Sequence, residues 1–226
     1  MATVPPESVK RPQDLAPLLD HTLLAPGATA ADLARLCAEA REHALGAVCV
    51  HRQAVAEARR LLAGAPVKVV AVADFPKGAG TTGARIVEAL EAVRAGADEI
   101  DLVAPLPALL SSRFEAVLDD LRSVVRALSV PVKVILETSA LDRDRKVAGA
   151  ALALAAGAAY VKTSTGFAGG GATVDDVALL RAVVGEAMGV KASGGIRTAA
   201  QALAMVRAGA DRIGSSSSIA IVTGKW

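Results

Sequence analysis

Aromatic side chains, cysteines and long apolar runs are all scarce in this chain of 226 residues. Phe, Trp and Tyr together make up 2% of the residues, so the chain has few rings on which nucleic-acid bases could stack. The 25 basic and 23 acidic residues leave a net charge of +2, which creates no strong field for nucleic acid or an anionic membrane surface. These shortages disfavour a nucleic-acid-binding protein.

The chain has two cysteines, Cys37 and Cys49, which form neither a paired metal-ligand pattern nor a disulfide framework. Charges or glycines interrupt each apolar run before about 18 residues, the length that a membrane-spanning helix needs. Residues 1–12 contain no apolar stretch typical of a signal peptide. The sequence therefore predicts a soluble protein of the reducing cytoplasm with no membrane partner.

Hydrophobic residues make up 53% of the chain, so Ala, Val, Leu and Ile must build the core. Short segments rich in β-forming residues alternate with helix-like segments, which is typical of parallel βαβ units. The candidate strands are residues 18–24, 47–50, 67–75, 99–104, 132–137, 160–165, 190–193 and 212–215. Each unit spans about 28 residues, which suits a (β/α)8 barrel, whereas an open doubly wound sheet rarely holds eight units in so short a chain. We expect a single α/β domain over residues 1–226, a TIM barrel with a parallel eight-stranded core, in which residues 1–14 form an N-terminal lead-in.

Helix starts and ends are marked by capping residues. Four pairs place a hydroxyl three residues before a side chain that can reach back to it. These pairs are Thr29 with Asp32, Ser139 with Asp142, Thr173 with Asp176, and Thr198 with Gln201. Gly96, Gly157 and Gly209 stand where a left-handed residue would end a helix before the next strand. Residues 94–98 and 207–211 are identical and indicate a weak internal repeat.

Charged residues interrupt four of the predicted strands, although strands of a parallel barrel are buried on both faces. They are Asp101, Lys133, Lys162 and Lys191. By strand alternation Lys162 and Lys191 point into the barrel from neighbouring strands, so the two amines would crowd in a poorly solvated space. One of them should then lose its proton readily and serve as the nucleophile of a Schiff-base reaction. Asp101 would pair with the remaining cation or move protons through water, and Lys133 would support the site electrostatically.

Glycine-rich loops with hydroxyl residues follow the last three predicted strands. They are residues 163–167 and 169–171 after the sixth strand, 193–195 after the seventh, and 214–218 after the eighth. Barrels bind phosphate at these strand ends through backbone N–H groups and a helix N-terminus, and hydroxyls such as that of Thr165 add donors. Asp20 and Thr22 of the first strand either reach substrate hydroxyls or cap the following loop. The sequence therefore predicts a carbonyl substrate that carries a phosphate.

The chain resembles the deoxyribose-phosphate aldolases, class I aldolases of deoxynucleoside catabolism, from about residue 18 to residue 217. The resemblance rests on residues 19–24, 48–50, 96–101, 133–138, 161–167 and 190–197, among which the motifs around Lys162 and Lys191 are the most specific. It implies a lyase that reversibly cleaves 2-deoxy-D-ribose 5-phosphate to acetaldehyde and D-glyceraldehyde 3-phosphate, with no metal or organic cofactor. Barrels of this kind commonly pair through helix faces, so a homo-oligomer, dimer or tetramer, is expected.

The resemblance also implies roles for individual residues. Lys162 matches the Schiff-base lysine, Lys191 the second lysine that favours its neutral form and shares proton transfer, and Asp101 the acid/base that works through water. The positions that match the phosphate site are Gly166, Gly194, Gly195, Gly214, Ser216 and Ser217. The chain departs from the usual family pattern at Arg52, Asp74, Arg85 and Ser218, none of which removes a catalytic group.

Three alternatives remain open at the level of sequence. The lysines could reach solvent from strand ends, or could only pair with Asp101 and Glu137. The chain could be another Schiff-base aldolase or a transaldolase-like barrel for a different sugar phosphate. It could also be a non-catalytic sugar-phosphate-binding barrel, although such a protein should have lost at least one of Lys162, Lys191 and Asp101, and all three are present.

Overall fold

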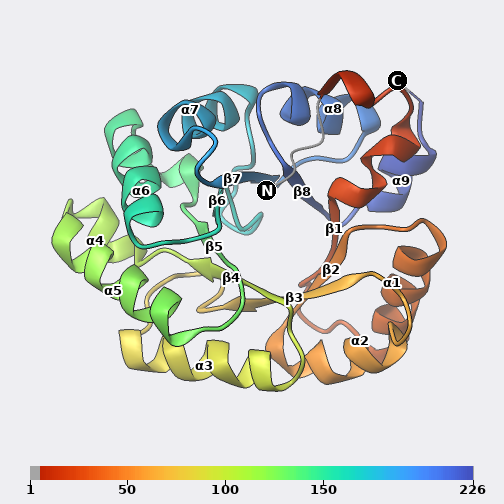
Figure 1. Ribbon diagram of the computed structural model, residues 1–226, viewed down its shortest axis with the longest axis horizontal. Helices are drawn as coiled ribbons and strands as arrows, with labels where there is room; N and C mark the ends of the chain where they lie inside the picture. The colour runs from red at the N-terminus through yellow and green to blue at the C-terminus, as the bar shows by residue number, and fades with distance from the viewer. Residues whose placement is uncertain (1–5, 226) are drawn as a thin grey trace.

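Eight parallel strands close into a barrel in sequence order in the computed structural model, which describes residues 6–225 (Figure 1). The strands are β1 (Leu19–Leu23), β2 (Ala47–Val50), β3 (Lys68–Ala73), β4 (Glu99–Val103), β5 (Val132–Ile135), β6 (Tyr160–Lys162), β7 (Gly189–Ser193) and β8 (Arg212–Ser215). Each strand coincides with one predicted segment to within a few residues. The predicted closed barrel is confirmed, and the open-sheet alternative is wrong because β8 pairs with β1.

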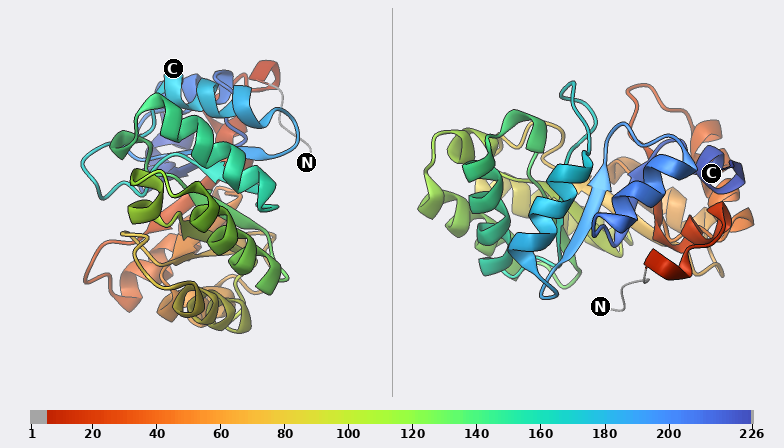
Figure 2. Two further views of the ribbon diagram at one scale, coloured as in Figure 1. Left: turned by 90° about the vertical axis from the view of Figure 1, so that its left-hand side faces the viewer. Right: turned by 90° about the horizontal axis from the view of Figure 1, so that it is seen from above.

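Helices surround the barrel on its outside (Figures 1 and 2). They are α1 (Ala30–Glu42), α2 (Val55–Leu61), α3 (Thr82–Arg94), α4 (Leu106–Leu110), α5 (Phe114–Ala127), α6 (Arg143–Ala155), α7 (Val174–Val184), α8 (Ala199–Arg207) and α9 (Ser218–Thr223). Of the predicted lead-in, residues 1–5 lie outside the described residues, and the rest forms the 3-10 helix η1 (Pro6–Ser8) and the start of η2 (Pro12–Leu18). No helix in the described part of the chain is long and apolar enough to cross a membrane.

The two faces of the strands bury different kinds of side chain. Outward-facing residues such as Val48, Val134 and Val190 join the helices in one large apolar core. Inside the barrel, the β1–β3 side holds a small apolar cluster, which consists of Leu24, Ala47, Cys49, Val70 and Val72. The rest of the interior, from β4 round to Asp20 on β1, is charged instead. Because charges are costly to bury without partners, this asymmetry needs an explanation.

The predicted helix caps are correct except at α6. Thr29 and Thr198 form complete capping boxes at α1 and α8. Thr173 caps α7, but the carboxylate of Asp176 binds Lys146 on α6 instead of reaching back to the cap. The prediction of Ser139 as the α6 cap is wrong, because Asp142 itself is the N-cap and accepts from the N–H of Arg145 at 2.9 Å.

The helix-terminating glycines adopt the predicted left-handed conformation, with φ of 106° at Gly96, 85° at Gly157 and 111° at Gly209. The repeated segments 94–98 and 207–211 also make the same contacts. Asp98 accepts from the N–H of Val69 on β3, and Asp211 accepts from the N–H of Val190 on β7. In each copy an arginine from α2 or α7 binds both the aspartate and the glycine carbonyl. The internal repeat is therefore a repeated structural unit that joins a helix end to the preceding strand.

Candidate active site

Three charged side chains predicted from strand alternation meet inside the barrel. Lys162 on β6 and Lys191 on β7 are register partners, and Asp101 enters from β4. One oxygen of Asp101, Oδ2, accepts from the amine of Lys162 at 2.7 Å and from the amine of Lys191 at 2.7 Å. The two lysines are 3% and 0% exposed, so the alternative in which they reach bulk solvent from the strand ends is wrong.

A wider set of buried charges surrounds this trio. We call Asp20, Glu99, Asp101, Lys133, Lys162, Lys191 and Arg212 the interior network. Lys133 donates to the second oxygen of Asp101 at 2.9 Å and lies 2.6 Å from Glu99, as expected for a residue that supports the site electrostatically. At the N-terminal end of the barrel Glu99 also binds Lys68, whose side chain is half exposed. The network therefore reaches from Lys162 to the N-terminal end of the barrel.

Asp20 belongs to this network and does not contribute to the cavity surface. It is fully buried, accepts from the amine of Lys191 and forms an ion pair with Arg212. The sequence predicted that Asp20 either reaches substrate hydroxyls or caps the following loop. In the structure its carboxylate is instead a buried counter-ion of Lys191. Thr22 does line the cavity, and its hydroxyl donates to the backbone carbonyl of Asp20 at 2.9 Å.

The carboxylates determine the protonation of Lys191 and Asp101. Burial lowers the pKa of Lys191, but Asp101 and Asp20 outweigh burial and raise this pKa above its ordinary value. Burial raises the pKa of Asp101, but the Lys133, Lys162 and Lys191 charges outweigh it and hold this pKa well below its ordinary value. Repulsion between the two amines and pairing with Asp101 were predicted from the sequence, whereas the contact of Lys191 with Asp20 was not. The raised pKa favours the protonated form of Lys191.

The charges of the interior network do not balance. Among the described residues it contains four potential cations, from Lys133, Lys162, Lys191 and Arg212, and three carboxylates. An uncompensated buried charge is expensive, so the network is satisfied best when one cation is neutral. Three of the cations are well compensated, because Lys133 contacts Glu99 and Asp101, Lys191 contacts Asp20 and Asp101, and Arg212 makes two bonds to Asp20. Lys162 makes a single bond, to an oxygen of Asp101 that it shares with Lys191. Lys162 is therefore the least compensated member.

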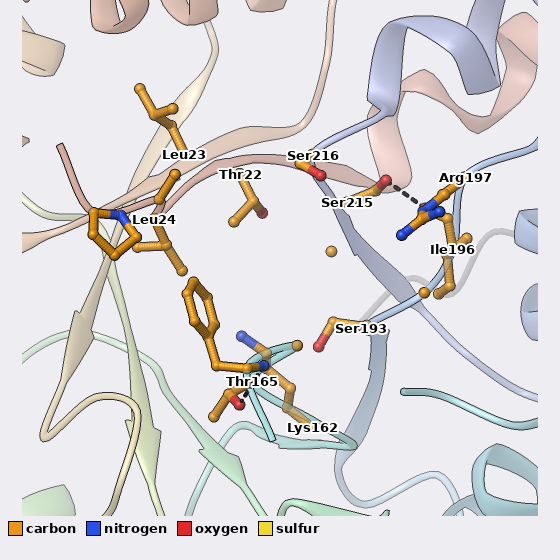
Figure 3. Close-up of a pocket in the computed structure, with 17 residues that line it drawn as sticks. Thr22, Leu23, Leu24, Lys162, Thr165, Ser193, Ile196, Arg197, Ser215 and Ser216 are labelled. Carbon is orange, nitrogen blue, oxygen red and sulfur yellow. Dashed lines mark hydrogen bonds between the residues drawn. The ribbon is translucent and has the colours of Figure 1, made fainter. Parts of the chain in front are cut away.

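A cavity of about 360 Å³ opens above the network at the C-terminal ends of the strands. Figure 3 shows the amine of Lys162 pointing into this cavity, with Ser215 and Ser216 across from it. Lys162 is the only member of the interior network, as far as the described residues go, that lines the cavity. Lys191 and Asp101 are fully buried, and Oδ2 of Asp101 bonds to both Lys162 and Lys191.

The predicted phosphate loops form the far wall of the cavity. Gly166, Gly194, Gly195, Gly214 and Ser216 all line it, whereas Ser217 does not. Within residues 6–225 the N–H groups of Gly166, Gly194, Gly195 and Ser216 have no protein acceptor, so they are free to donate to a bound anion. The hydroxyl of Ser215 links two of the loops, because it donates to the carbonyl of Ile196 and accepts from the N–H of Ser217.

Two of the predicted glycine positions serve packing. A side-chain carbon at Gly171 would lie 2.4 Å from the carbonyl oxygen of Gly194, so Gly171 lets two loops approach closely. None of the glycines 169–171 lines the cavity. Gly214 lines the cavity, and a side-chain carbon there would also lie 3.1 Å from Cε of Lys191. Glycine at position 214 therefore leaves room for the buried lysine as well as for a ligand.

Arg197 and Phe167 are among the residues of the cavity wall that were not predicted as site residues from the sequence. Arg197, on the loop after β7, is an exposed cation in the cavity wall beside Gly194 and Gly195. Phe167 is 47% exposed and packs edge-on against Phe75, with 5.2 Å between ring centres. The motif 190–197 contains Arg197, so the signal for that residue was present. No periodicity marks Phe167, because its place in the wall depends on how the loop folds over the barrel.

The departures from the family pattern are accommodated locally. Asp74, which replaces a usual glycine, has φ of 50°, a conformation that glycine adopts freely. It lies 3.3 Å from buried Arg85, the second departure, so these two substitutions contact each other. Arg52 pairs with Glu91 at 2.7 Å, and the hydroxyl of Ser218 donates to the carbonyl of Ser215. None of the four side chains lines the cavity.

Comparison with known proteins gives consistent results. A model of the family described as DeoC/LacD family aldolase matches residues 15–223. Deoxyribose-phosphate aldolase of Bdellovibrio bacteriovorus is 49% identical over 211 residues, which cover 93% of this chain and 96% of that protein. The Thermotoga maritima enzyme of the same name is 49% identical over 213 residues, covering 94% of this chain and 86% of that protein. A structure of deoxyribose phosphate aldolase from Aeropyrum pernix, described as tetrameric, has a TM-score of 0.88 at 35% identity and covers 96% of this chain and 94% of its own.

Proposed function

This chain belongs to the DeoC/LacD family of aldolases, and we propose that it is a deoxyribose-phosphate aldolase that works through a Schiff base on Lys162. The reaction is the reversible cleavage of 2-deoxy-D-ribose 5-phosphate to acetaldehyde and D-glyceraldehyde 3-phosphate. One observation carries the assignment of Lys162. It is the member of the interior network that lines the cavity, and it is also the member with the least carboxylate compensation.

The first step of the proposed reaction forms the imine. The neutral amine of Lys162 adds to the C1 aldehyde of the open-chain sugar, and the carbinolamine loses water after its hydroxyl gains a proton. Lys191 lies directly behind Lys162 and carries a proton at neutral pH, because Asp20 and Asp101 hold its pKa above the ordinary value. Lys191 is therefore placed to deliver that proton and, by microscopic reversibility, to take it back in the reverse step, while Asp101 holds both amines in position.

The second step breaks the C2–C3 bond. A base removes the proton of the C3 hydroxyl, the electron pair of the C2–C3 bond moves to the iminium nitrogen, and D-glyceraldehyde 3-phosphate leaves. The enamine carbon then gains a proton, and hydrolysis of the resulting imine releases acetaldehyde and restores the amine of Lys162. Asp101 stays anionic because its pKa lies well below the ordinary value, and we assign it the relay of these protons through water.

The phosphate would bind at the opposite end of the cavity. The free N–H groups of Gly166, Gly194, Gly195 and Ser216 supply donors, and Arg197 supplies a compensating charge. This arrangement holds the aldehyde end of the sugar at Lys162, since the anchored phosphate fixes the far end. Orientation of this kind lowers the barrier by reducing the entropy lost when the reacting groups meet.

Borohydride reduction in the presence of acetaldehyde tests the proposal. We expect peptide mapping by mass spectrometry to find an N-ethyl group on Lys162, because reduction converts the imine into a stable secondary amine. Dihydroxyacetone in place of acetaldehyde provides the matched control, since a different Schiff-base aldolase would prefer another donor. An adduct absent from Lys162, or formed more readily with dihydroxyacetone, would contradict the assignment.

We further propose a homo-oligomer located in the cytoplasm. The tetramer described for the Aeropyrum pernix enzyme supports assembly, and the two buried free cysteines agree with a reducing compartment. We expect sedimentation velocity at micromolar concentration to give a dimer or tetramer. A species that remains monomeric as the protein concentration is raised tenfold would contradict the assembly.

A further inference from the structure

Glu137 lies just after the end of β5, where the chain still pairs irregularly with the end of β6. The N–H of Leu136 donates to the carbonyl of Lys162, and the N–H of Thr138 donates to the carbonyl of Thr163. The pairing thus advances two residues along β5 but only one along β6, so Glu137 is an extra residue, as in a β-bulge. It adopts a left-handed conformation, with φ of 54° and ψ of 63°, which is uncommon for a residue other than glycine.

The bulge directs the carboxylate of Glu137 at the loop that follows β6. Its Oε2 accepts from the N–H of Thr165 at 3.0 Å and also from the Thr165 hydroxyl. The same hydroxyl oxygen accepts from the N–H of Phe167 at 3.1 Å. A chain of hydrogen bonds therefore runs from Glu137 through Thr165 to Phe167 and spans the turn at Gly166, whose φ is 86°.

This chain of bonds determines which groups of the turn face the cavity. Thr165, Gly166 and Phe167 line the cavity, whereas Glu137 does not. Because both donors of Thr165 are used by the carboxylate, the group that the turn leaves free to bind an anion is the N–H of Gly166. The sequence-level expectation that the Thr165 hydroxyl is itself a phosphate donor is replaced by this indirect role.

The cost of burying Glu137 indicates that its position matters. The side chain is 1% exposed, and its Oε1 has no hydrogen-bond partner in the described part of the chain. No described lysine or arginine forms an ion pair with it either, unlike the carboxylates of the interior network. A carboxylate without a cation, buried on a strained backbone, persists only where its surroundings fix it.

We propose that Glu137 is a positioning residue for phosphate recognition, which holds the 165–167 turn so that the Gly166 N–H faces the phosphate of the substrate. The inference rests on the function proposed above, because it assigns one end of the same cavity to the phosphate. Glu137 does not touch the aldehyde end, since Lys162 is fixed separately by Asp101. It should therefore affect recognition of the phosphate and leave imine formation intact.

Replacement of Glu137 tests this division of roles. For Glu137→Ala we expect KM for deoxyribose 5-phosphate to rise about 10- to 100-fold, the scale of loss caused by a misplaced binding group. The inhibition constant of inorganic phosphate should rise in parallel. Turnover of unphosphorylated 2-deoxyribose and borohydride trapping of acetaldehyde on Lys162 should stay near the wild-type values.

Two further variants keep the inference testable if Glu137→Ala folds poorly. Glu137→Gln retains an oxygen that can accept from Thr165, so it should restore most of the phosphate affinity. Thr165→Val removes only the hydroxyl that links Glu137 to Phe167, so it should weaken phosphate binding and should not add fully to Glu137→Ala in the double variant.

The outcomes separate this inference from the proposed function. If acetaldehyde is not trapped on Lys162 in the wild-type protein, the proposed function fails. A second case is that acetaldehyde is trapped on Lys162 of an active wild-type protein. If Glu137→Ala and Thr165→Val then lower kcat/KM for deoxyribose and for deoxyribose 5-phosphate by the same factor, only the role of Glu137 is overturned. The same holds if the two variants leave inhibition by inorganic phosphate unchanged.

Discussion

Replacement of Lys162 by methionine is expected to lower kcat/KM for deoxyribose 5-phosphate by about 10⁴-fold or more, the scale seen when a covalent nucleophile is removed. Methionine has nearly the length of lysine but no amine, so the cavity keeps its shape and loses its nucleophile. The measurement is a coupled assay that detects D-glyceraldehyde 3-phosphate. Binding of inorganic phosphate should be unchanged, because the phosphate loops do not depend on the Lys162 amine.

Lys162→Met should fold as well as the wild type. The substitution removes the least compensated cation of the interior network and leaves three cations to three carboxylates, while Asp101 keeps Lys133 and Lys191 as partners. We therefore expect the free energy of unfolding, measured by urea denaturation, to change by less than about 1 kcal/mol. A variant that folds and retains more than a small fraction of wild-type turnover would show that another group forms the imine.

The second large effect is expected for Asp101→Asn. This change removes the carboxylate that contacts three buried amines, those of Lys133, Lys162 and Lys191. Activity should fall about 10²- to 10⁴-fold, the usual contribution of an acid/base group. At neutral pH the free energy of unfolding should fall by about 3–5 kcal/mol, because the lysines are left buried with too few counter-ions.

The pH dependence of that stability difference follows from the pKa of Asp101. The pKa in the folded state lies well below the ordinary value of 3.8, so ionised Asp101 stabilises the fold above that pH. The contribution is lost as the pH falls through the folded-state pKa. The difference in unfolding free energy between wild type and Asp101→Asn should therefore be constant near neutrality and shrink below about pH 4.

Asp176→Asn provides a matched control. Asp176 is also a buried carboxylate paired with a lysine, but it lies on the outer helix α7 and its partner Lys146 lies on α6. This variant should lose stability without a comparable loss of kcat. If Asp101→Asn instead loses activity only in proportion to its stability, the acid/base role of Asp101 is wrong and the residue is purely structural.

Individual residues show how far the sequence could predict the site. Alternation along each strand was enough to place Lys162, Lys191 and Asp101 inside the barrel, and the six motifs were enough to predict the family that the comparison confirms. Alternation could not assign Asp20, which pairs with Lys191 across 171 residues of sequence. That contact exists only because β8 closes onto β1, and the closure is a property of the whole chain.

Loop residues show the same limit. The glycines after β6 and β7 predicted an anion site, but the sequence could not distinguish Gly166 and Gly194, which line the cavity, from Gly171, which packs against another loop. It also gave no sign of the bulge at Glu137 or of the place of Phe167 in the cavity wall. Loop conformation depends on contacts with neighbouring strand ends, which are remote in sequence.

The amino-acid sequence by itself determined the eight strands, the helix ends at glycine, the burial of charged residues on the inner barrel face and the chemistry that two lysines and an aspartate allow. These follow from local periodicity and from the identity of each side chain. Only the tertiary structure decided which carboxylates raise the pKa of Lys191 and which lysine lines the cavity. The reason is that protonation and access depend on distances between charges from different strands, and these distances are fixed only when the barrel closes.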